Sequence, residues 1–94
     1  MFKFGLSKQV KTFLEKLGKK DKILARAINR KIKEIISRDN DTIDYYKNLS
    51  KGLKAFKRVH ITNWLVLIFE VDLKKNFIVF HKIGHRDEIY KALV

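Results

Sequence analysis

The chain has 94 residues, no cysteine and a formal net charge of +12, from 22 basic against 10 acidic side chains. This length suits one compact domain over residues 1–94, and a hydrophobic content of 46% excludes a disordered basic tail. No apolar run reaches the roughly 20 residues of a membrane span, and the start lacks the apolar core of a signal peptide. The absence of cysteine fits a reducing cytoplasm.

The positive charge extends over both halves of the chain. A field of this kind attracts polyanions: RNA, DNA, an acidic membrane surface or an acidic protein. Charge that serves solubility alone is the alternative, although solubility needs a net charge of only about 2–8 in a small domain.

The first half of the chain predicts a strand and two helices. Residues 2–6 alternate apolar with small or polar side chains, which is the pattern of a strand. Ser7 suits the N-cap of a helix whose apolar positions recur at helical spacing up to Gly18, where we expect the helix to end. Asp21 can cap a second helix, so the short connection predicts an antiparallel helical hairpin. The apolar stripe of the second helix is formed by Leu24, Ala27, Ile28, Ile32 and Ile35.

The second half predicts an antiparallel meander. We expect three strands over residues 53–61, 64–72 and 77–83. The middle segment is nearly all apolar, which is typical of a central strand covered on both faces. Gly84 should end the last strand, and residues 86–93 should form a short closing helix.

These elements define an α+β fold. It consists of an N-terminal strand, an antiparallel helical hairpin, a three-stranded antiparallel meander and a short C-terminal helix. The helical hairpin should cover one face of the sheet. The other face is left partly open, and a ligand can sit there.

All three histidines lie in the second half, two of them beside an arginine. Arg58 and His60 are two residues apart, so they share one face of a strand and could hold a phosphate and reach a hydroxyl. An ordinary solvated strand face is the alternative. His85 and Arg86 stand where a strand gives way to a helix, and a helix start with a guanidinium suits an anion. His81 reads as a structural strand residue.

Further basic and aromatic residues surround this region. Lys54, Lys57 and Lys82 are candidates for phosphate contacts without sequence preference, with ordinary surface charge as the alternative. Trp64 and Tyr90 could either pack in the core or stack on RNA bases. No HxxxH pattern lies on a predicted helix and no cysteine assists the histidines, so the sequence predicts no metal site.

The order of elements, together with LKAFKRVHITNWLVLIFEVD at 53–72 and HKIGHRDEIYK at 81–91, resembles the RelE/ParE toxin superfamily over almost the whole chain. The ending GHRDEIY is similar to the family pattern GHR-x-x-[VI]-Y and is the most specific part. The RelE branch implies a ribosome-dependent endoribonuclease that cuts mRNA in the A site and so inhibits translation. It implies that the 2′-OH of the RNA is the nucleophile, without metal or cofactor.

The resemblance also implies the partners of the protein. They are an acidic, RelB-like antitoxin that neutralises the toxin, and the ribosome with its mRNA. DNA would be reached only indirectly, through the toxin–antitoxin complex, and no membrane is involved.

Site residues carry over from the RelE branch one by one. Its basic pair on the second strand matches Arg58 and His60, and its late arginine and tyrosine match Arg86 and Tyr90. Its third-strand arginine falls on Val66, which is a departure from the pattern.

The YafQ-like branch of the same superfamily relies on histidines instead. Its turn pattern resembles Val59-His60-Ile61 followed by Asn63-Trp64, and its late histidine matches His85. Asn63 replaces the acidic residue of that branch. The sequence therefore has features of both branches.

Taken together, the resemblance implies one catalytic set, which consists of Arg58, His60, His85, Arg86 and Tyr90. His60 or His85 would serve as base and acid, and the arginines would stabilise charge on the phosphate. Two other functions stay open. One is a ParE-like inhibitor of gyrase that acts by protein–protein contact, and the other is a basic nucleic-acid-binding module without catalysis.

Overall fold

The computed structural model describes residues 1–49 and 55–93, without the side chains of Tyr90, Ala92 and Leu93. Its elements are β1 (Lys3–Leu6), α1 (Lys8–Lys20), α2 (Lys22–Ile36), the short 3-10 helix η1 (Ile43–Tyr45), β2 (Phe56–His60), β3 (Leu65–Asp72), β4 (Phe77–His85) and α3 (Arg86–Leu93). This order confirms the predicted α+β fold class. The first two residues of the strand predicted over 53–61 lie outside the described residues.

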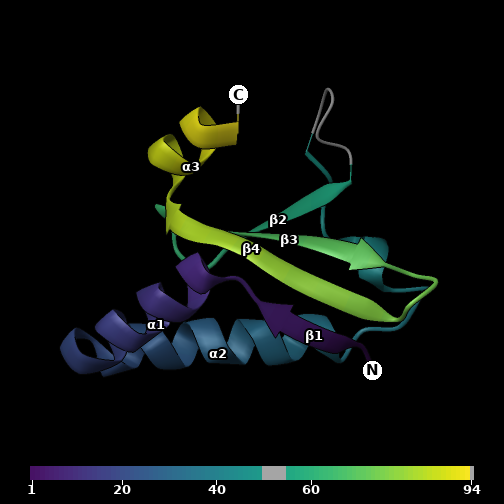
Figure 1. Cartoon of the computed structure of the whole chain (residues 1–94), viewed down its shortest axis with the longest axis horizontal. Helices are drawn as coiled ribbons and strands as arrows, with labels where there is room; N and C mark the ends of the chain where they lie inside the picture. Colours follow the sequence, from purple (N-terminus) through teal and green to yellow (C-terminus); the bar gives the residue numbers. More distant parts are fainter. Residues whose placement is uncertain (50–54, 94) are drawn as a thin grey trace.

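The four strands form one sheet in the order β1-β4-β3-β2. β2, β3 and β4 make the predicted antiparallel meander, while β1 pairs in parallel with β4. Figure 1 shows α1 and α2 lying along one face of the sheet and α3 on the other. We call these the helix-covered face and the open face.

Both helices of the hairpin begin as predicted. The Ser7 hydroxyl accepts the backbone N–H of Val10 at 3.2 Å, and the Asp21 carboxylate accepts that of Leu24 at 3.0 Å. The prediction that Gly18 ends the first helix is wrong, because α1 continues to Lys20. No glycine among the described residues has the positive φ that a glycine helix end requires, and Asp21 alone connects the helices.

The core lies between the hairpin and the helix-covered face. Of the predicted stripe on α2, Ile28, Ile32 and Ile35 are buried, while Leu24 packs against the core only partly. They meet the sheet at fully buried residues, chiefly Leu65, Leu67, Phe69, Ile78 and Phe80. This apolar burial is the main stabilising contribution to the fold.

β3 is buried on both faces, as its apolar sequence predicted. Leu67 belongs to the helix-covered core, whereas Val66 and Ile68 form a second cluster with Ile89 of α3 on the open face. All three strand residues are 0% exposed. The open face is therefore only partly open, because α3 covers its centre.

The prediction that Gly84 ends the last strand is wrong, because β4 continues to His85. Gly84 is paired with Val66 on the open face. A Cβ at this position would lie 3.4 Å from Cδ1 of Ile89. This is an ordinary van der Waals distance, so Ile89 of α3 packs directly on the strand at Gly84.

Candidate functional site

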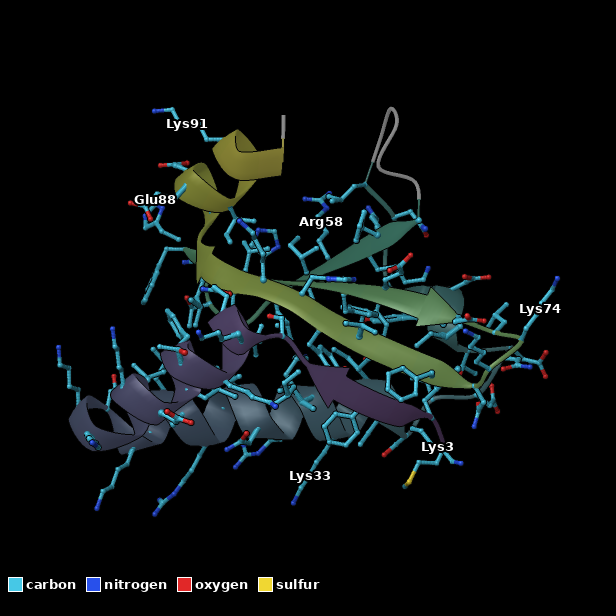
Figure 2. The ribbon with its side chains drawn as sticks, viewed as in Figure 1. Lys3, Lys33, Arg58, Lys74, Glu88 and Lys91 are labelled. Carbon is cyan, nitrogen blue, oxygen red and sulfur yellow. The ribbon has the colours of Figure 1, made fainter. Side chains whose placement is uncertain are left out.

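Strand β2 presents alternate side chains to the two faces of the sheet. Val59 packs against the helix-covered core. Arg58 is paired with Ile68, and His60 with Val66, both of which face α3. The prediction that Arg58 and His60 share a face is thus confirmed, and Figure 2 shows Arg58 on the same side of the sheet as α3.

Lys82 adds a second cation to the open face. It is paired with Ile68, which is paired in turn with Arg58 on the other side. The backbones of Arg58 and Lys82 therefore lie two strand spacings apart, roughly 10 Å. Between them Ile89 packs on Ile68 and Val66, so α3 stands over β3 and β4.

Trp64, His85 and Arg86 gather at one end of the sheet, beside the turn between β2 and β3. The backbone N–H of Arg86 donates to the carbonyl of Trp64 at 2.7 Å, and its guanidinium lies 3.5 Å from the carbonyl of Asn63. The rings of Trp64 and His85 stack with centroids 6.0 Å apart and planes 28° apart. Trp64 is 44% exposed, so it is not a core residue.

His85 also caps α3. Its Nδ1 accepts the backbone N–H of Asp87 at 3.2 Å, so a neutral His85 carries its proton on Nε2. The Asp87 carboxylate lies 3.8 Å from Nδ1 of His85 and 3.8 Å from Nε of Arg86. Both predicted residues are thus held in place by the first turn of α3.

The prediction of an RNA contact for Lys57 is wrong. This lysine is 5% exposed and extends to the side of the sheet opposite Arg58. Its ammonium group donates to Asp44 at 3.1 Å, to the carbonyl of Tyr46 at 3.0 Å and to Asn48 at 2.7 Å. All three N–H groups have acceptors, so Lys57 anchors the segment 44–48 to β2.

The structure does not describe the side chains of two predicted site residues. Lys54 lies beyond the described residues, and of Tyr90 only the backbone, within α3, is described. At Val66, where the RelE branch has an arginine, the structure has a fully buried contact of Ile89. A charge there would have to lie under α3, so this departure from the pattern has a packing reason.

A hollow of about 430 Å³ lies at the outer edge of β2, and it is lined by Tyr45, Tyr46, Lys47, Arg58, Val59 and His60. Tyr45 is 72% exposed, and the Arg38 guanidinium lies 4.6 Å from its ring centroid. Tyr45 and Lys47 were missed by the sequence reasoning, which assigned no element and no site residue to this stretch. An aromatic next to a lysine just before a basic strand was the available signal.

A hydrogen-bonded group holds Tyr46 in the wall of this hollow. Its hydroxyl donates to the Glu34 carboxylate and lies 3.4 Å from Nε of Arg38. The hydrogen bond from this hydroxyl lowers the pKa of Glu34. The pKa of Tyr46 is raised, chiefly by burial and to a smaller extent by the same hydrogen bond. These contacts fix one side of the hollow to α2.

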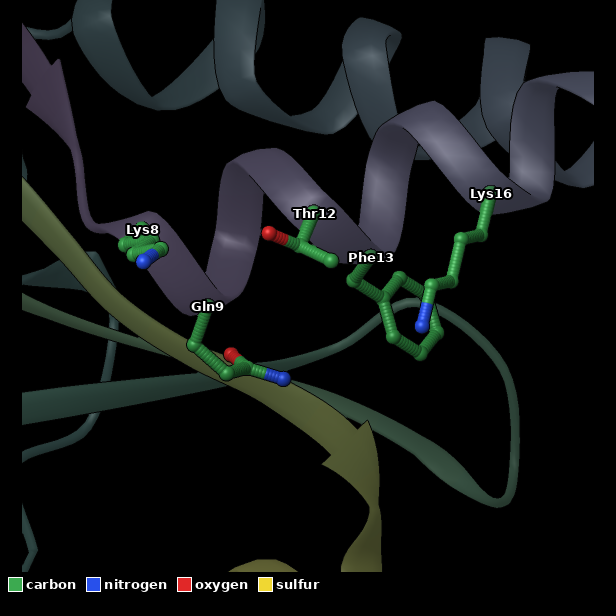
Figure 3. A pocket seen from close by; sticks show the side chains of 5 residues that line it. All are labelled: Lys8, Gln9, Thr12, Phe13 and Lys16. Atoms are coloured by element: carbon green, nitrogen blue, oxygen red, sulfur yellow. The ribbon is translucent and has the colours of Figure 1, made fainter.

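A second hollow, also of about 430 Å³, lies on α1 (Figure 3), and its lining residues are Lys8, Gln9, Thr12, Phe13 and Lys16. The Gln9 amide accepts the N–H of Ile83 at 2.9 Å and donates to its carbonyl at 2.7 Å. The Gln9 side chain thus forms hydrogen bonds with the backbone of β4 beyond the point where β1 ends. This hollow shares no lining residue with the one at β2.

Within residues 1–49 and 55–93, no three histidine, aspartate or glutamate side chains form a group that could hold a metal ion. None of the helices in the same part of the chain is both long and apolar enough to cross a membrane.

The predicted site residues therefore form two neighbouring groups. One group lies on the open face and consists of Arg58, His60 and Lys82. The other lies at the end of the sheet and consists of Trp64, His85 and Arg86. Lys57 belongs to neither group. The arrangement offers cations for a phosphate, imidazoles for proton transfer and an exposed indole.

No family model matches the chain. A candidate toxin, RelE4, of Methanocaldococcus jannaschii is 37% identical over 91 residues, which cover 97% of this chain and 93% of the relative. The fold is similar to that of a metal-bound toxin from Helicobacter pylori, with a TM-score of 0.74 at 22% identity over 95% and 99% of the two chains. It is also similar to the YoeB-YefM complex from Staphylococcus aureus, with a TM-score of 0.72 at 18% identity over 92% and 98%.

Proposed function

Because the chain belongs to the RelE/ParE toxin superfamily, we propose that it is the toxin of a type II toxin–antitoxin system that cuts mRNA in the ribosomal A site. The observation that supports cleavage best is the placement of Arg58 and His60 on one face of β2. A guanidinium that binds phosphate and an imidazole that moves a proton are two of the groups that cleavage of RNA needs.

The reaction follows from the chemistry of RNA. The 2′-OH attacks the adjacent phosphorus, the bond to the 5′ oxygen breaks, and a 2′,3′-cyclic phosphate forms. One group accepts the proton of the 2′-OH, and another supplies a proton to the leaving oxygen. Each positioned acid or base contributes roughly 10²–10⁴-fold to the rate. No metal or cofactor enters the proposal.

We assign proton transfer to His60 and His85, and stabilisation of phosphate charge to Arg58 and Arg86. His60 is exposed beside Arg58, and His85 is fixed by Trp64 and by the first turn of α3. Tyr90, which lies in α3, keeps its assigned role as part of the proposal. Trp64, Lys82 and Lys54 are assigned to contacts with RNA.

The proposed partners are the ribosome with its mRNA, in the cytoplasm, and an acidic antitoxin. The similar YoeB structure is a complex with YefM, and the net charge of +12 favours an acidic partner here. Raising the salt concentration should weaken the charged contacts with the antitoxin and leave the hydrophobic part intact.

The test is cleavage of mRNA on programmed ribosomes, read by primer extension. We expect discrete cuts between codon positions with the wild-type chain, and strongly reduced cuts with Arg86→Ala. Arg26→Ala, which removes an exposed arginine of α2, is the matched control and should cut normally.

Two results would contradict the proposal. Intact mRNA together with arrested DNA replication in expressing cells would indicate the ParE-like function. Binding of nucleic acid with neither effect would indicate a basic module without catalysis.

A further inference from the structure

The open face carries a second imidazole, which the proposed mechanism does not use. Nε2 of His81 lies 3.0 Å from Oε1 of Glu70, and the two side chains are 36% and 41% exposed. The ring of Phe56 meets the His81 ring edge-on, with centroids 5.2 Å apart. We propose that His81, oriented by Glu70, is a catalytic residue that accepts the proton of the RNA 2′-OH; this inference rests on the proposed function.

A bulge in β4 places His81 on this face. The register with β3 shifts between Ile68 and Phe69, and His81 is the residue without a partner in it. Phe80 and Ile83 both belong to the helix-covered core although they are three residues apart. His81 and Lys82 between them therefore both reach the open face, which a regular strand would not allow.

The stability of the protein does not account for this arrangement. A partly exposed pair such as Glu70 and His81 contributes about 0–1 kcal/mol. The bulge, in contrast, interrupts the ladder between the two central strands. Bulges of this kind commonly re-aim a side chain next to an active site.

The pair lies beside the cations of the open face. Glu70 is paired with Phe56, and Arg58 is the next residue of β2 on the same face. Arg58 and Glu70 are thus diagonal neighbours, with backbones roughly 7–8 Å apart. His85 lies at the far end of the sheet, three residues beyond Lys82. A phosphate held by Arg58 and Lys82 is therefore closer to His81 than to His85.

The hydrogen bond defines which nitrogen reacts. Glu70 accepts the proton on Nε2 of His81, so Nδ1 carries the lone pair. As the 2′ oxygen bonds to phosphorus, its proton passes to Nδ1, and the carboxylate stabilises the resulting imidazolium. The bond from phosphorus to the 5′ oxygen breaks, and that oxygen takes a proton from His60, so His81 replaces His85 as the second proton-transferring group of the proposed function. Glu70 is then a positioning residue.

Loss of the His81 imidazole should slow cleavage without weakening binding to the ribosome. With ribosomes programmed by mRNA, His81→Gln should slow single-turnover cleavage about 10²–10⁴-fold. Binding to ribosomes carrying a 2′-O-methyl mRNA, which cannot be cut, should change by less than about threefold. Glu15→Gln, which alters an exposed carboxylate of α1, is the control and should change neither.

The Glu70→Gln variant tests whether Glu70 acts by orienting the His81 ring rather than by maintaining the fold. We expect Glu70→Gln to slow cleavage less than His81→Gln does. Combining the two changes should cause no further loss, because both disable the same Glu70–His81 pair. Nitrogen-15 NMR of the wild type should show His81 with its proton on Nε2, and Glu70→Gln should give a mixture of tautomers. Circular dichroism spectra like that of the wild type establish that both variants are folded.

The outcomes distinguish this inference from the proposed function. If the wild type cuts programmed mRNA and a folded His81→Gln variant cuts at the same rate, His81 is not catalytic although the function stands. Equal losses of binding and cleavage would likewise overturn the catalytic role. If the wild type never cuts, both proposals fail.

Discussion

The two faces of the sheet use similar residues for different purposes. On the helix-covered face, thirteen buried hydrophobic residues form one core cluster, and the one buried lysine among the described residues, Lys57, donates to three acceptors. On the open face, only Val66, Ile68 and Ile89 form a buried cluster, and arginine, lysine and histidine surround it.

Strand β2 carries the whole contrast within two residues. Lys57 and Arg58 are adjacent cations, but the alternation of side chains sends one into the interior and the other to the open face. The role of a basic residue here depends on the face that it reaches. Four substitutions test this difference, in order of decreasing expected effect.

Removing a core side chain of the helix-covered face should have the largest effect. Phe69 is 0% exposed and packs on Tyr46 and Phe80. Phe69→Ala should lower the free energy of unfolding by about 3–5 kcal/mol, because it removes apolar contacts and leaves a cavity. Urea denaturation measures this. Leu73→Ala, at a half-exposed position, should cost less than about 1 kcal/mol; similar losses for both would contradict the assignment of the core.

Removing Arg58 from the open face should reduce mRNA cleavage and leave the stability of the fold nearly unchanged. Arg58→Gln should reduce mRNA cleavage about 10²–10³-fold, because a group that stabilises charge on the phosphate is lost. The free energy of unfolding should change by no more than about 0.5–1 kcal/mol. Arg30→Gln, on the exposed side of α2, should leave both unchanged. Unreduced cleavage by Arg58→Gln would remove the arginine from the mechanism.

Removing Lys57, the cation next to Arg58 in β2, should lower the stability of the fold and leave mRNA cleavage unchanged. Lys57→Met keeps the aliphatic chain but removes the hydrogen bonds that Lys57 donates to the carbonyl of Tyr46 and to Oδ1 of Asn48. We expect a loss of about 2 kcal/mol in the free energy of unfolding, measured by urea denaturation. Lys47→Met, at an exposed position, should be neutral. A stable Lys57→Met protein with selectively lost RNA binding would show that Lys57 does contact RNA.

The smallest effect should come from the group that fixes the hollow to α2. Tyr46→Phe removes the hydroxyl that donates to Glu34 and should cost about 1 kcal/mol, since Glu34 is 42% exposed and water screens the contact. That hydroxyl lowers the pKa of Glu34 from 4.5, so its contribution is complete above pH 4.5 and is lost as the pH falls through the lowered value.

The measurement is urea denaturation of the wild type and Tyr46→Phe over the range from neutral to acid pH. The difference between the two proteins should therefore be constant near neutrality and narrow below pH 4.5. A difference that widens on acidification would show that the carboxylate does not stabilise the fold through Tyr46.

Several features of the fold were determined by the sequence alone, because they depend on neighbours in the chain. Ser7 and Asp21 cap their helices through bonds to the third residue after them, and the two-residue period of β2 sets the shared face of Arg58 and His60. The apolar run of β3 likewise predicted burial on both faces.

Other features were decided only by the tertiary structure, because they depend on what lies opposite a residue. Lys57 is buried because Asp44 and Asn48, from a stretch to which the sequence assigned no element, supply its acceptors. The bulge that brings His81 to Glu70 arises from pairing with β3, and the contact of Ile89 with the strand at Gly84 arises from the packing of α3. Local patterns specify the direction of a side chain, whereas its burial, partners and chemistry depend on the elements that pack against it.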